Sequence, residues 1–210
     1  KRYYYTLLFG DKYRVKIATR NVNIPGIQNF RDLGGYPSYP GKKQMRWGMI
    51  YRSAEIDSLE YCSRRELKNL GIKTLIDLRT PSEIGRQSPL QKGFNVVHIP
   101  LATGDMEDIL QGIREEKIKC DTVYRMVERM NRTLIDKYTK EYRQIFDILL
   151  DKTNYPVVIH CSSGKGRTGI VSALVLAALG VNEDIIMEDY RLSNDYFNIP
   201  RASKYAYRLP

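Results

Sequence analysis

The residue types best suited to covalent chemistry lie in one run of ten, His160-Cys-Ser-Ser-Gly-Lys-Gly-Arg-Thr-Gly169. Cys161 supplies a thiol, whose thiolate form is a nucleophile. Arg167 carries a planar guanidinium group that can bind two phosphate oxygens at once, which a lysine does not reproduce. A cysteine alone is more often a buried structural thiol, but this combination predicts nucleophilic attack on a phosphate ester.

The glycine-containing spacing is typical of an anion-binding loop at the start of a helix. Backbone N–H groups there point toward the anion and share the positive end of the helix dipole, which also favours the thiolate. We expect Gly164, Gly166 and Gly169 to adopt conformations or close approaches that a Cβ would oppose. The residues expected to contact the substrate phosphate are Ser162, Ser163, Gly164, Lys165, Gly166 and Thr168.

A leaving alkoxide or phenolate needs a proton, so the site also requires a carboxylic acid. Asp77 is the first candidate for this general acid, because it ends an apolar strand at the edge where parallel sheets bind ligands. An acid that pairs with Arg79 and holds the strand end is an equally good interpretation of Asp77. Asp32 and Asp189 are weaker candidates.

Other polar residues are expected to support the loop rather than react. We expect His160 to orient the loop through hydrogen bonds, and Arg31 and Arg52 to brace it rather than to contact substrate. No metal or other cofactor is predicted, since His98 and His160 are the only histidines and no carboxylate cluster is spaced with them.

Apolar runs that alternate with helical patterns supply the elements that position the loop. Buried strands are predicted near residues 49–51, 72–78, 94–99 and 156–160, the last leading through the loop into a helix over 170–179. Two helices, or one broken helix, fit residues 121–150. The sequence therefore predicts an α/β fold with a mostly parallel central sheet flanked by helices.

Three short motifs predict helix starts. Ser63 with Glu66 forms a capping-box pattern, and Thr80-Pro81-Ser82-Glu83 repeats it, with Glu83 reaching back to residue 80. Asn182 is expected to cap a final helix through residue 190.

The chain is predicted to divide into two parts. Residues 1–20 are expected to form an N-terminal β-hairpin with a tight turn at Gly10-Asp11, as an edge of the next domain or a remnant of an upstream β domain. Residues 21–210 have the size of one catalytic domain. Because the chain starts at Lys1 rather than Met, we expect a processed or trimmed product whose N-terminus does not assign a compartment.

Composition limits the partners. A formal charge of +10 favours acidic partners, although runs such as Lys42-Lys43, Arg64-Arg65 and the tail with Arg201, Lys204 and Arg208 are more often solvated faces. No nucleic-acid motif accompanies the charge, so nucleic acid is not an expected partner. No apolar stretch reaches the ~20 residues of a membrane span, so we expect a soluble protein, with secretion or a periplasmic location left open.

The three cysteines, Cys62, Cys120 and Cys161, show neither CxxC nor zinc-site spacing. A disulfide framework is therefore excluded as the main source of stability. Two buried free thiols at positions 62 and 120 are a more typical arrangement than a single bridge between them.

The loop resembles the HCxxGxxR(S/T)G signature of the cysteine-dependent protein tyrosine and dual-specificity phosphatase superfamily. Further motifs make residues 24–195 similar to its bacterial tyrosine/serine phosphatase family: Asn29-Phe-Arg-Asp-Leu-Gly-Gly-Tyr36, Trp47-Gly48 with Tyr51-Arg-Ser53, Asp77-Leu-Arg79, Tyr138 with Glu141-Tyr-Arg143, and Asp189-Tyr190 with Ser193-Asn194-Asp195. That family has GKDRTG where this chain has Gly166 in place of the aspartate. The change makes the loop similar to tensin-type phosphoinositide phosphatases.

The resemblance implies a role for each main loop residue. Cys161 would form a phosphocysteine, Arg167 would bind the phosphoryl oxygens, and the Thr168 hydroxyl would hydrogen-bond the sulfur as it departs. Asp77 matches the DLR position of the family. Lys165 adds a second cation that either favours highly charged substrates or is simply solvated.

The implied substrate is a phosphotyrosine protein, with phosphoserine or phosphothreonine also open and a phosphoinositide or inositol phosphate as the alternative. A non-catalytic phosphate-binding adaptor is a rival that the intact Cys161, Arg167 and Thr168 disfavour. A rhodanese or arsenate reductase shares the strand–cysteine–loop–helix order, but Arg167 favours phosphate. The sequence does not predict an oligomeric state.

Overall fold

The computed structural model describes residues 2–10, 12–39, 43–56, 61–84, 93–103 and 120–198. Its centre is a five-stranded sheet with the order β3-β6-β9-β7-β8. The strands are β3 (Arg31–Asp32), β6 (Ile50–Ser53), β7 (Thr74–Asp77), β8 (Asn95–His98) and β9 (Val157–His160). β6, β9, β7 and β8 pair in parallel, and β3 joins the edge antiparallel to β6. The predicted mostly parallel α/β fold is confirmed.

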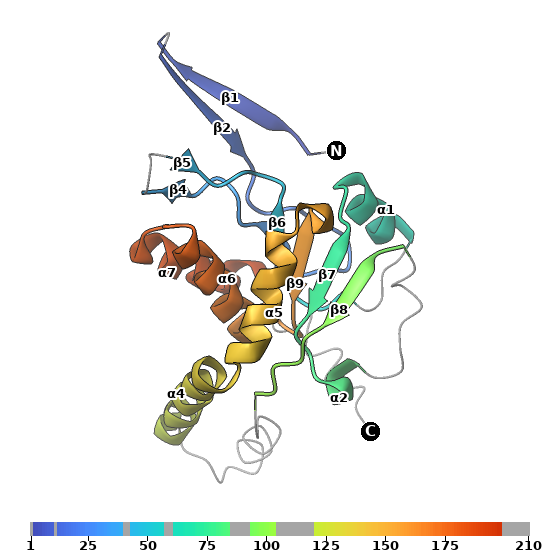
Figure 1. Cartoon of the computed structure of the whole chain (residues 1–210), viewed down its shortest axis with the longest axis vertical. Helices are drawn as coiled ribbons and strands as arrows, with labels where there is room; N and C mark the ends of the chain where they lie inside the picture. The colour runs from blue at the N-terminus through green and yellow to red at the C-terminus, as the bar shows by residue number, and fades with distance from the viewer. Residues whose placement is uncertain are drawn as a thin grey trace.

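Successive side chains of the central strands are buried on opposite faces of this sheet. Leu75 and Val158 pack with α1 on one face, whereas Ile76 and Ile159 pack with α4, α5 and α6 on the other (Figure 1). All four side chains are at most 4% exposed, and burying each contributes about 1.5–3 kcal/mol. The sheet is therefore apolar on both faces, as expected of parallel strands between two helical layers.

The helices follow the predicted order. They are α1 (Tyr61–Asn69), α2 (Pro81–Ile84), α4 (Cys120–Lys137), α5 (Thr139–Leu150), the 3₁₀ turn η2 (Lys152–Asn154), α6 (Gly166–Ala178), α7 (Glu183–Arg191) and α8 (Ser193–Tyr196). The pattern over 121–150 forms two helices that divide at Tyr138. Its buried ring is fixed by hydrogen bonds between its hydroxyl and the backbone of Ala102, at 3.1 and 3.2 Å.

Two of the three predicted helix starts are confirmed. The Thr80 N–H donates to the Glu83 carboxylate (2.9 Å), and the Asp184 N–H donates to the Asn182 side chain (2.8 Å). Ser63 is not a cap: it is the third residue of α1, buried, and its hydroxyl donates to the Pro25 carbonyl at 2.6 Å. The motif predicts that the Ser63 oxygen accepts a hydrogen bond from the local Glu66 N–H, whereas here the hydroxyl donates to a distant carbonyl.

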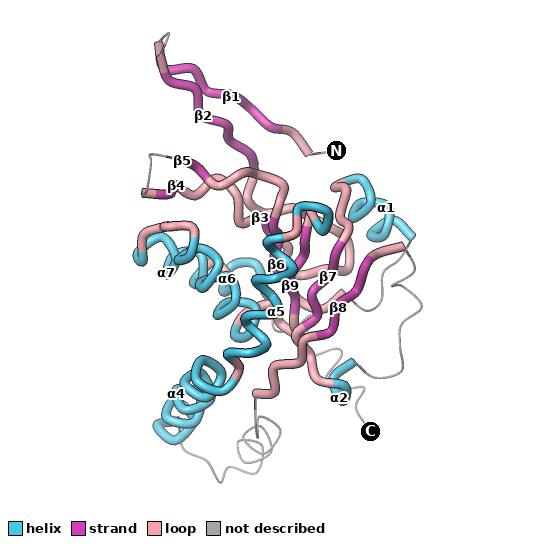
Figure 2. Tube along the Cα trace, viewed as in Figure 1, coloured by secondary structure: helices cyan, strands magenta, loops and turns pink. Residues whose placement is uncertain are grey.

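The N-terminal residues form a hairpin of β1 (Tyr4–Phe9) and β2 (Tyr13–Ala18) that projects from the sheet beside the small β4 (Pro37–Ser38) and β5 (Lys43–Gln44) pair (Figure 2). Phe9 pairs with Tyr13, so three residues lie between the strands rather than the predicted two. Asp11 of the predicted turn lies outside the described residues.

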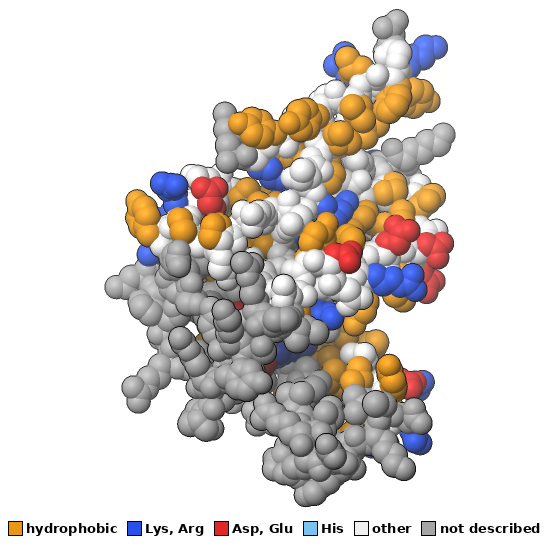
Figure 3. All heavy atoms as spheres, turned by 180° about the vertical axis from the view of Figure 1, so that it is seen from behind, with side chains coloured by type: hydrophobic (Ala, Val, Ile, Leu, Met, Phe, Trp, Pro, Cys, Tyr) orange, Lys and Arg blue, Asp and Glu red, His pale blue; other side chains and the backbone are white. Residues whose placement is uncertain are grey.

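The base of the hairpin contacts the segments that carry β3 and β6. The Trp47 indole N–H donates to the Lys16 carbonyl (2.8 Å), and Arg2 pairs with the buried Asp32 carboxylate while its guanidinium lies 5.6 Å from the Trp47 ring centre. Whether the hairpin is an edge of the following domain or a remnant of an upstream one stays a prediction. Leu8 is 65% exposed and Phe9 is 59% exposed. Figure 3 shows apolar side chains along the surface of the hairpin.

The half-buried Cys62 thiol is not part of a disulfide. The side chain of Cys120, Lys42 and the basic tail beyond residue 198 lie outside the described residues. No helix in the described ranges is both long and apolar enough to cross a bilayer.

Candidate active site

The cysteine–arginine loop lies at the edge of the sheet where the parallel strands end. Cys161 directly follows β9, between the ends of β6 and β7, and is 2% exposed. The helix begins at Gly166, four residues before the predicted start at 170, so Arg167 lies in its first turn. The backbone thus brings the nucleophile and the guanidinium to one helix N-terminus.

The loop backbone offers hydrogen-bond donors on one side only. The carbonyls of Ser162, Ser163 and Gly164 accept hydrogen bonds from the Glu55 N–H and from the side chains of Asn29 and Arg52, at 2.8–3.1 Å. Within the described residues, the N–H groups of the same three residues have no acceptor. Consecutive free N–H groups at a helix N-terminus form an anion-binding concavity.

Asn29 and Arg52 belong to a buried network behind the loop. Asn29 adopts a positive φ of 56° and accepts from Arg31 while its amide bonds the Ser163 and Gly164 carbonyls. Arg31 and Arg52 both pair with Asp189, at 3.3 and 2.7 Å. These contacts match the predicted bracing by the two arginines, because the hydrogen-bond partners of both guanidinium groups are protein groups behind the loop.

The electrostatics of this network keep Asp189 and Arg31 charged. Burial alone would raise the pKa of Asp189, but Arg52 and Arg31 lower it below its usual value. Burial, together with the neighbouring Arg52, lowers the pKa of Arg31 to about 10, still above neutral pH. The ion pairs are therefore intact under physiological conditions.

The three loop glycines differ in what they require. Gly164 has a φ of +68°, and a Cβ there would lie 2.4 Å from the Ser53 carbonyl oxygen. A Cβ on Gly169 would lie 2.7 Å from the Tyr190 ring. Gly166 has no atom within 4 Å of a Cβ and no positive φ, so the prediction that all three oppose a side chain is wrong for Gly166. Its backbone is ordinary helix, which any residue can adopt.

Arg167 is 6% exposed and binds a carboxylate that the sequence did not assign to the site. Its Nη1 and Nη2 atoms donate to the two oxygens of Glu83 at 2.6 and 2.5 Å, and Nη2 also lies 3.2 Å from the Ser162 hydroxyl. Burial opposes both charges, but this bidentate pair raises the pKa of Arg167 and lowers that of Glu83 to about 2. The capping motif in α2 is the only sequence signal for Glu83.

Asp77 lies at the end of β7, as predicted, and is fully buried. Its carboxylate accepts three hydrogen bonds from the Arg79 guanidinium and one from the Arg79 N–H, at 2.6–3.2 Å. Burial would raise the pKa of Asp77, but Arg79 and His160, whose Nδ1 is 3.8 Å away, lower it. An acid that must donate a proton near neutral pH needs a raised pKa, so this geometry favours the strand-end role that the sequence left open.

The weaker acid candidates lie behind or away from the loop. Asp32 accepts from the Gly34 and Gly48 N–H groups, both at 2.7 Å, and pairs with Arg2. Asp189 is committed to the bracing arginines described above. Each carboxylate therefore has a structural partner.

Two loop side chains differ from simple expectation. The Thr168 hydroxyl is fully buried and has no hydrogen-bond partner among the described residues, so it does not contact the Cys161 sulfur in this state. Lys165 is not simply solvated, since its Nζ donates to the Asn194 side chain at 3.0 Å. His160 is buried between the loop and Asp77.

The described ranges contain no cluster of three or more His, Cys, Asp or Glu side chains that could bind a metal ion. A nucleophilic sulfur, a guanidinium and a row of free N–H groups therefore form the chemical inventory of this site. Together they can attract an oxyanion and present a thiol to its central atom.

Comparisons with known proteins found a matching family and several similar chains. A family model described as a tyrosine phosphatase family matches residues 22–208. The triple specificity protein phosphatase PtpB of Mycobacterium tuberculosis is 29% identical over 82% of this chain, and a putative tyrosine-protein phosphatase of Cupriavidus necator is 31% identical over 80%. The chain spans 68% and 61% of the lengths of these two relatives. Crystalline TpbA of P. aeruginosa shares 15% identity at a TM-score of 0.41, covering 84% of this chain and 91% of TpbA.

Proposed function

This chain belongs to the tyrosine phosphatase family, and we propose that it hydrolyses phosphoric monoesters through a phosphocysteine, with phosphotyrosine proteins as its main substrates. The observation that supports this most directly is the row of free N–H groups at Ser162, Ser163 and Gly164 beside Cys161 and Arg167. Such a row stabilises a phosphoryl dianion and the thiolate that attacks it. The name of the mycobacterial relative extends the proposal to phosphoserine and phosphothreonine.

The reaction follows from these positions in two steps. The Cys161 thiolate attacks phosphorus, forming a P–S bond as the P–O bond to the leaving group breaks and the leaving oxygen takes up a proton. Water then attacks the phosphocysteine, which releases inorganic phosphate and returns the thiolate. Arg167 and the loop N–H groups stabilise the charge on the equatorial oxygens in both steps, and the unpartnered Thr168 hydroxyl is available to donate to the departing sulfur.

Cys161→Ser tests this proposal against a phosphate-binding adaptor. Turnover of p-nitrophenyl phosphate should disappear, while phosphate binding by calorimetry should persist because the N–H groups and Arg167 remain. Residual turnover within about tenfold of the parent would contradict covalent catalysis by this sulfur. Thiosulfate and arsenate assayed in parallel exclude or identify the sulfur-transfer and arsenate-reductase alternatives.

A phosphoinositide or inositol phosphate is the second candidate substrate. It is favoured by the open space at Gly166 and by Lys165, a cation within two residues of Arg167. Additional phosphates on a substrate would meet positive charge there rather than a carboxylate.

A further inference from the structure

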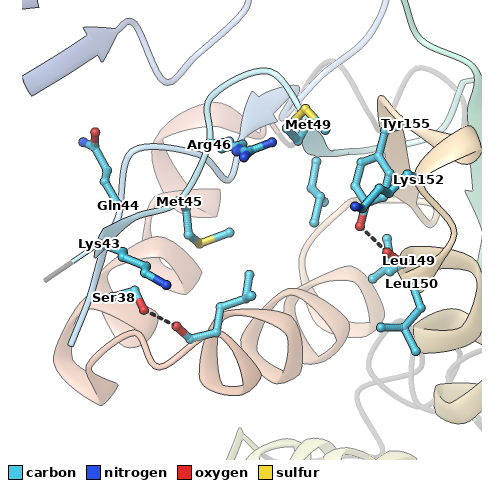
Figure 4. Close-up of a pocket in the computed structure, with 12 residues that line it drawn as sticks. Ser38, Lys43, Gln44, Met45, Arg46, Met49, Leu149, Leu150, Lys152 and Tyr155 are labelled. Carbon is cyan, nitrogen blue, oxygen red and sulfur yellow. Dashed lines mark hydrogen bonds between the residues drawn. The ribbon is translucent and has the colours of Figure 1, made fainter. Parts of the chain in front are cut away.

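A second concave site lies at the other end of α6 from the catalytic loop. α6 starts in that loop at Gly166, and Leu179, directly after its last residue, lines a pocket of about 500 Å³. The pocket lies between the segment that carries β4 and β5 and the end of α5 (Figure 4). Its volume falls within the roughly 300–1,000 Å³ of small-molecule sites. We call it the α6-end pocket.

The walls of the α6-end pocket are mainly apolar. They are formed by Met45, Met49, Ile50, Leu149, Leu150 and Leu179. Leu150 is 79% exposed and Leu179 is 46% exposed, so a ligand here would cover apolar surface that the fold leaves in water. Unbranched methionine side chains adapt to irregular apolar ligands, which suits a flexible hydrocarbon chain.

Three cations complete the lining: Lys43, Arg46 and Lys152. Figure 4 draws Lys43 and Lys152 on opposite sides of the pocket. Among the described residues, no carboxylate lines the pocket. The side chains of the three cations also have no hydrogen-bond partner and no ion pair within that part of the chain.

Each neutral polar side chain of the lining donates a hydrogen bond to a backbone carbonyl: Ser38 to Leu179, Gln44 to Gly35, and Tyr155 to Leu149. The lining is therefore dominated by apolar walls and positive charge, a combination that favours an anionic amphiphile.

We propose that the α6-end pocket binds a long-chain fatty acid, with its acyl chain against the Met and Leu walls and its carboxylate attracted by the positive charge that Lys43, Arg46 and Lys152 give to the lining. A single chain fits a pocket of this volume, whereas a specific protein partner covers about 800 Å² on each side. The pocket does not overlap the catalytic loop, because the two sites lie at opposite ends of α6.

Dodecanoate, titrated calorimetrically below its critical micelle concentration at low ionic strength, should bind saturably with one site per chain. Hexanoate should bind much more weakly, and dodecyltrimethylammonium should fail, because the chain length and the negative charge are both needed. The double variant Lys43→Glu with Lys152→Glu should weaken dodecanoate binding by about tenfold or more. Leu150→Asp should also weaken it, and its exposure keeps the core intact.

The matched control is Arg129→Glu with Lys140→Glu, which makes the same change in net charge on exposed positions of α4 and α5. It should leave dodecanoate affinity within about twofold. Leu8→Asp tests the exposed hairpin and should also have no effect. Saturating inorganic phosphate should not displace dodecanoate, since competition would place the fatty acid at the catalytic loop. The proposal would be overturned if dodecanoate did not bind, or if the cationic amphiphile bound equally well. It would also be overturned if the two charge-reversal variants had equal effects while both retained the parental circular dichroism.

Discussion

Arg167 has few N–H groups left for a phosphate while Glu83 is bound. Both protons on Nη2 have acceptors, the Glu83 carboxylate and the Ser162 hydroxyl, and Nη1 faces Glu83 together with the Leu78 and Leu101 carbonyls. The pair fixes the plane of the guanidinium beside the loop. Because the pKa of Glu83 is about 2, this contact does not titrate across the pH range in which the protein would work.

Glu83→Gln should therefore damage catalysis through the position of Arg167. An amide presents N–H to the guanidinium where the carboxylate presented an oxygen, so one side of the bidentate contact is lost. We expect kcat/KM for p-nitrophenyl phosphate to fall about tenfold or more, with a pH profile of unchanged shape between pH 5 and 8 because the lost pair is ionised throughout. Glu128→Gln, an equal charge change on exposed α4, is the control. Parental kinetics in Glu83→Gln would show that Arg167 is positioned without it.

Asp77→Asn distinguishes the two roles that the sequence left open for this residue. If Asp77 holds Arg79, the change leaves a buried arginine without its charge partner and should cost about 3–5 kcal/mol of unfolding free energy. Turnover of alkyl and aryl phosphates should then fall equally. A general acid would instead show a loss of about 10²-fold for alkyl phosphates, a smaller loss for aryl phosphates and a flattened basic limb.

The sign of the pH dependence gives a second measurement for Asp77. Its pKa is lowered in the folded state, so its stabilising contribution is present above the unfolded value of about 3.9 and is lost as the pH falls below it. The difference in Tm between the parent and Asp77→Asn should shrink below pH 4. A constant difference down to pH 2.5 would contradict a stabilising ion pair.

At the scale of elements, the catalytic loop connects β9 to α6 and packs against the end of β6. Gly164 lies against the end of β6, and Asn29 and Arg52 bond its carbonyl from behind. The apolar strands and the loop could be predicted from sequence because each pattern is local. β6 extends to Ser53, two residues beyond the predicted apolar strand at 49–51. The polar Arg52 can lie in this buried strand because it pairs with Asp189, which is distant in the sequence.

The same limit explains what could not be predicted within the helices. Glu83 satisfies a capping motif, and nothing in the sequence nearby indicates that Arg167 lies against it. Ser63 satisfies a capping motif as well, yet its hydroxyl bonds Pro25, almost forty residues earlier. Local chemistry predicts which groups need partners, whereas the fold decides which distant residue supplies them.

Two alanine substitutions test the packing of the loop on β6. Gly164→Ala places a Cβ 2.4 Å from the Ser53 oxygen at a positive φ, so the loop must move and turnover should fall by 10²-fold or so. Gly166→Ala meets no atom within 4 Å and replaces glycine in a helix, so it should keep near-parental kcat and gain roughly 0.5–1 kcal/mol of stability. Equal damage by both would show that flexibility of the loop, rather than close packing, is what the glycines supply.

At the scale of the whole molecule, the reactive end and the hairpin face opposite directions. Figure 1 places α2, which carries Glu83, at the end of the molecule away from β1 and β2. A partner bound to the exposed hairpin therefore leaves the catalytic loop open. The net charge of +10 acts on every approaching anion regardless of this arrangement.

Substrate choice is the last expectation, and it depends on how that charge is distributed at the loop. Lys165 lies beside Arg167 with no carboxylate at position 166 to offset it, so a substrate with several phosphates gains more attraction than one with a single phosphate. We expect hydrolysis of inositol phosphates or phosphoinositides alongside phosphotyrosine peptides. Their kcat/KM should fall more steeply with salt, because the Debye length is about 10 Å at 0.1 M. Lys165→Ala should reduce turnover of the polyphosphorylated substrates more than that of the peptides, whereas Lys140→Ala on α5 should affect neither. A panel in which phosphotyrosine peptides are turned over well and every inositol-based substrate is inert would contradict this expectation. Lys165, held by its hydrogen bond to Asn194, would then attract any phosphate without selecting among substrates.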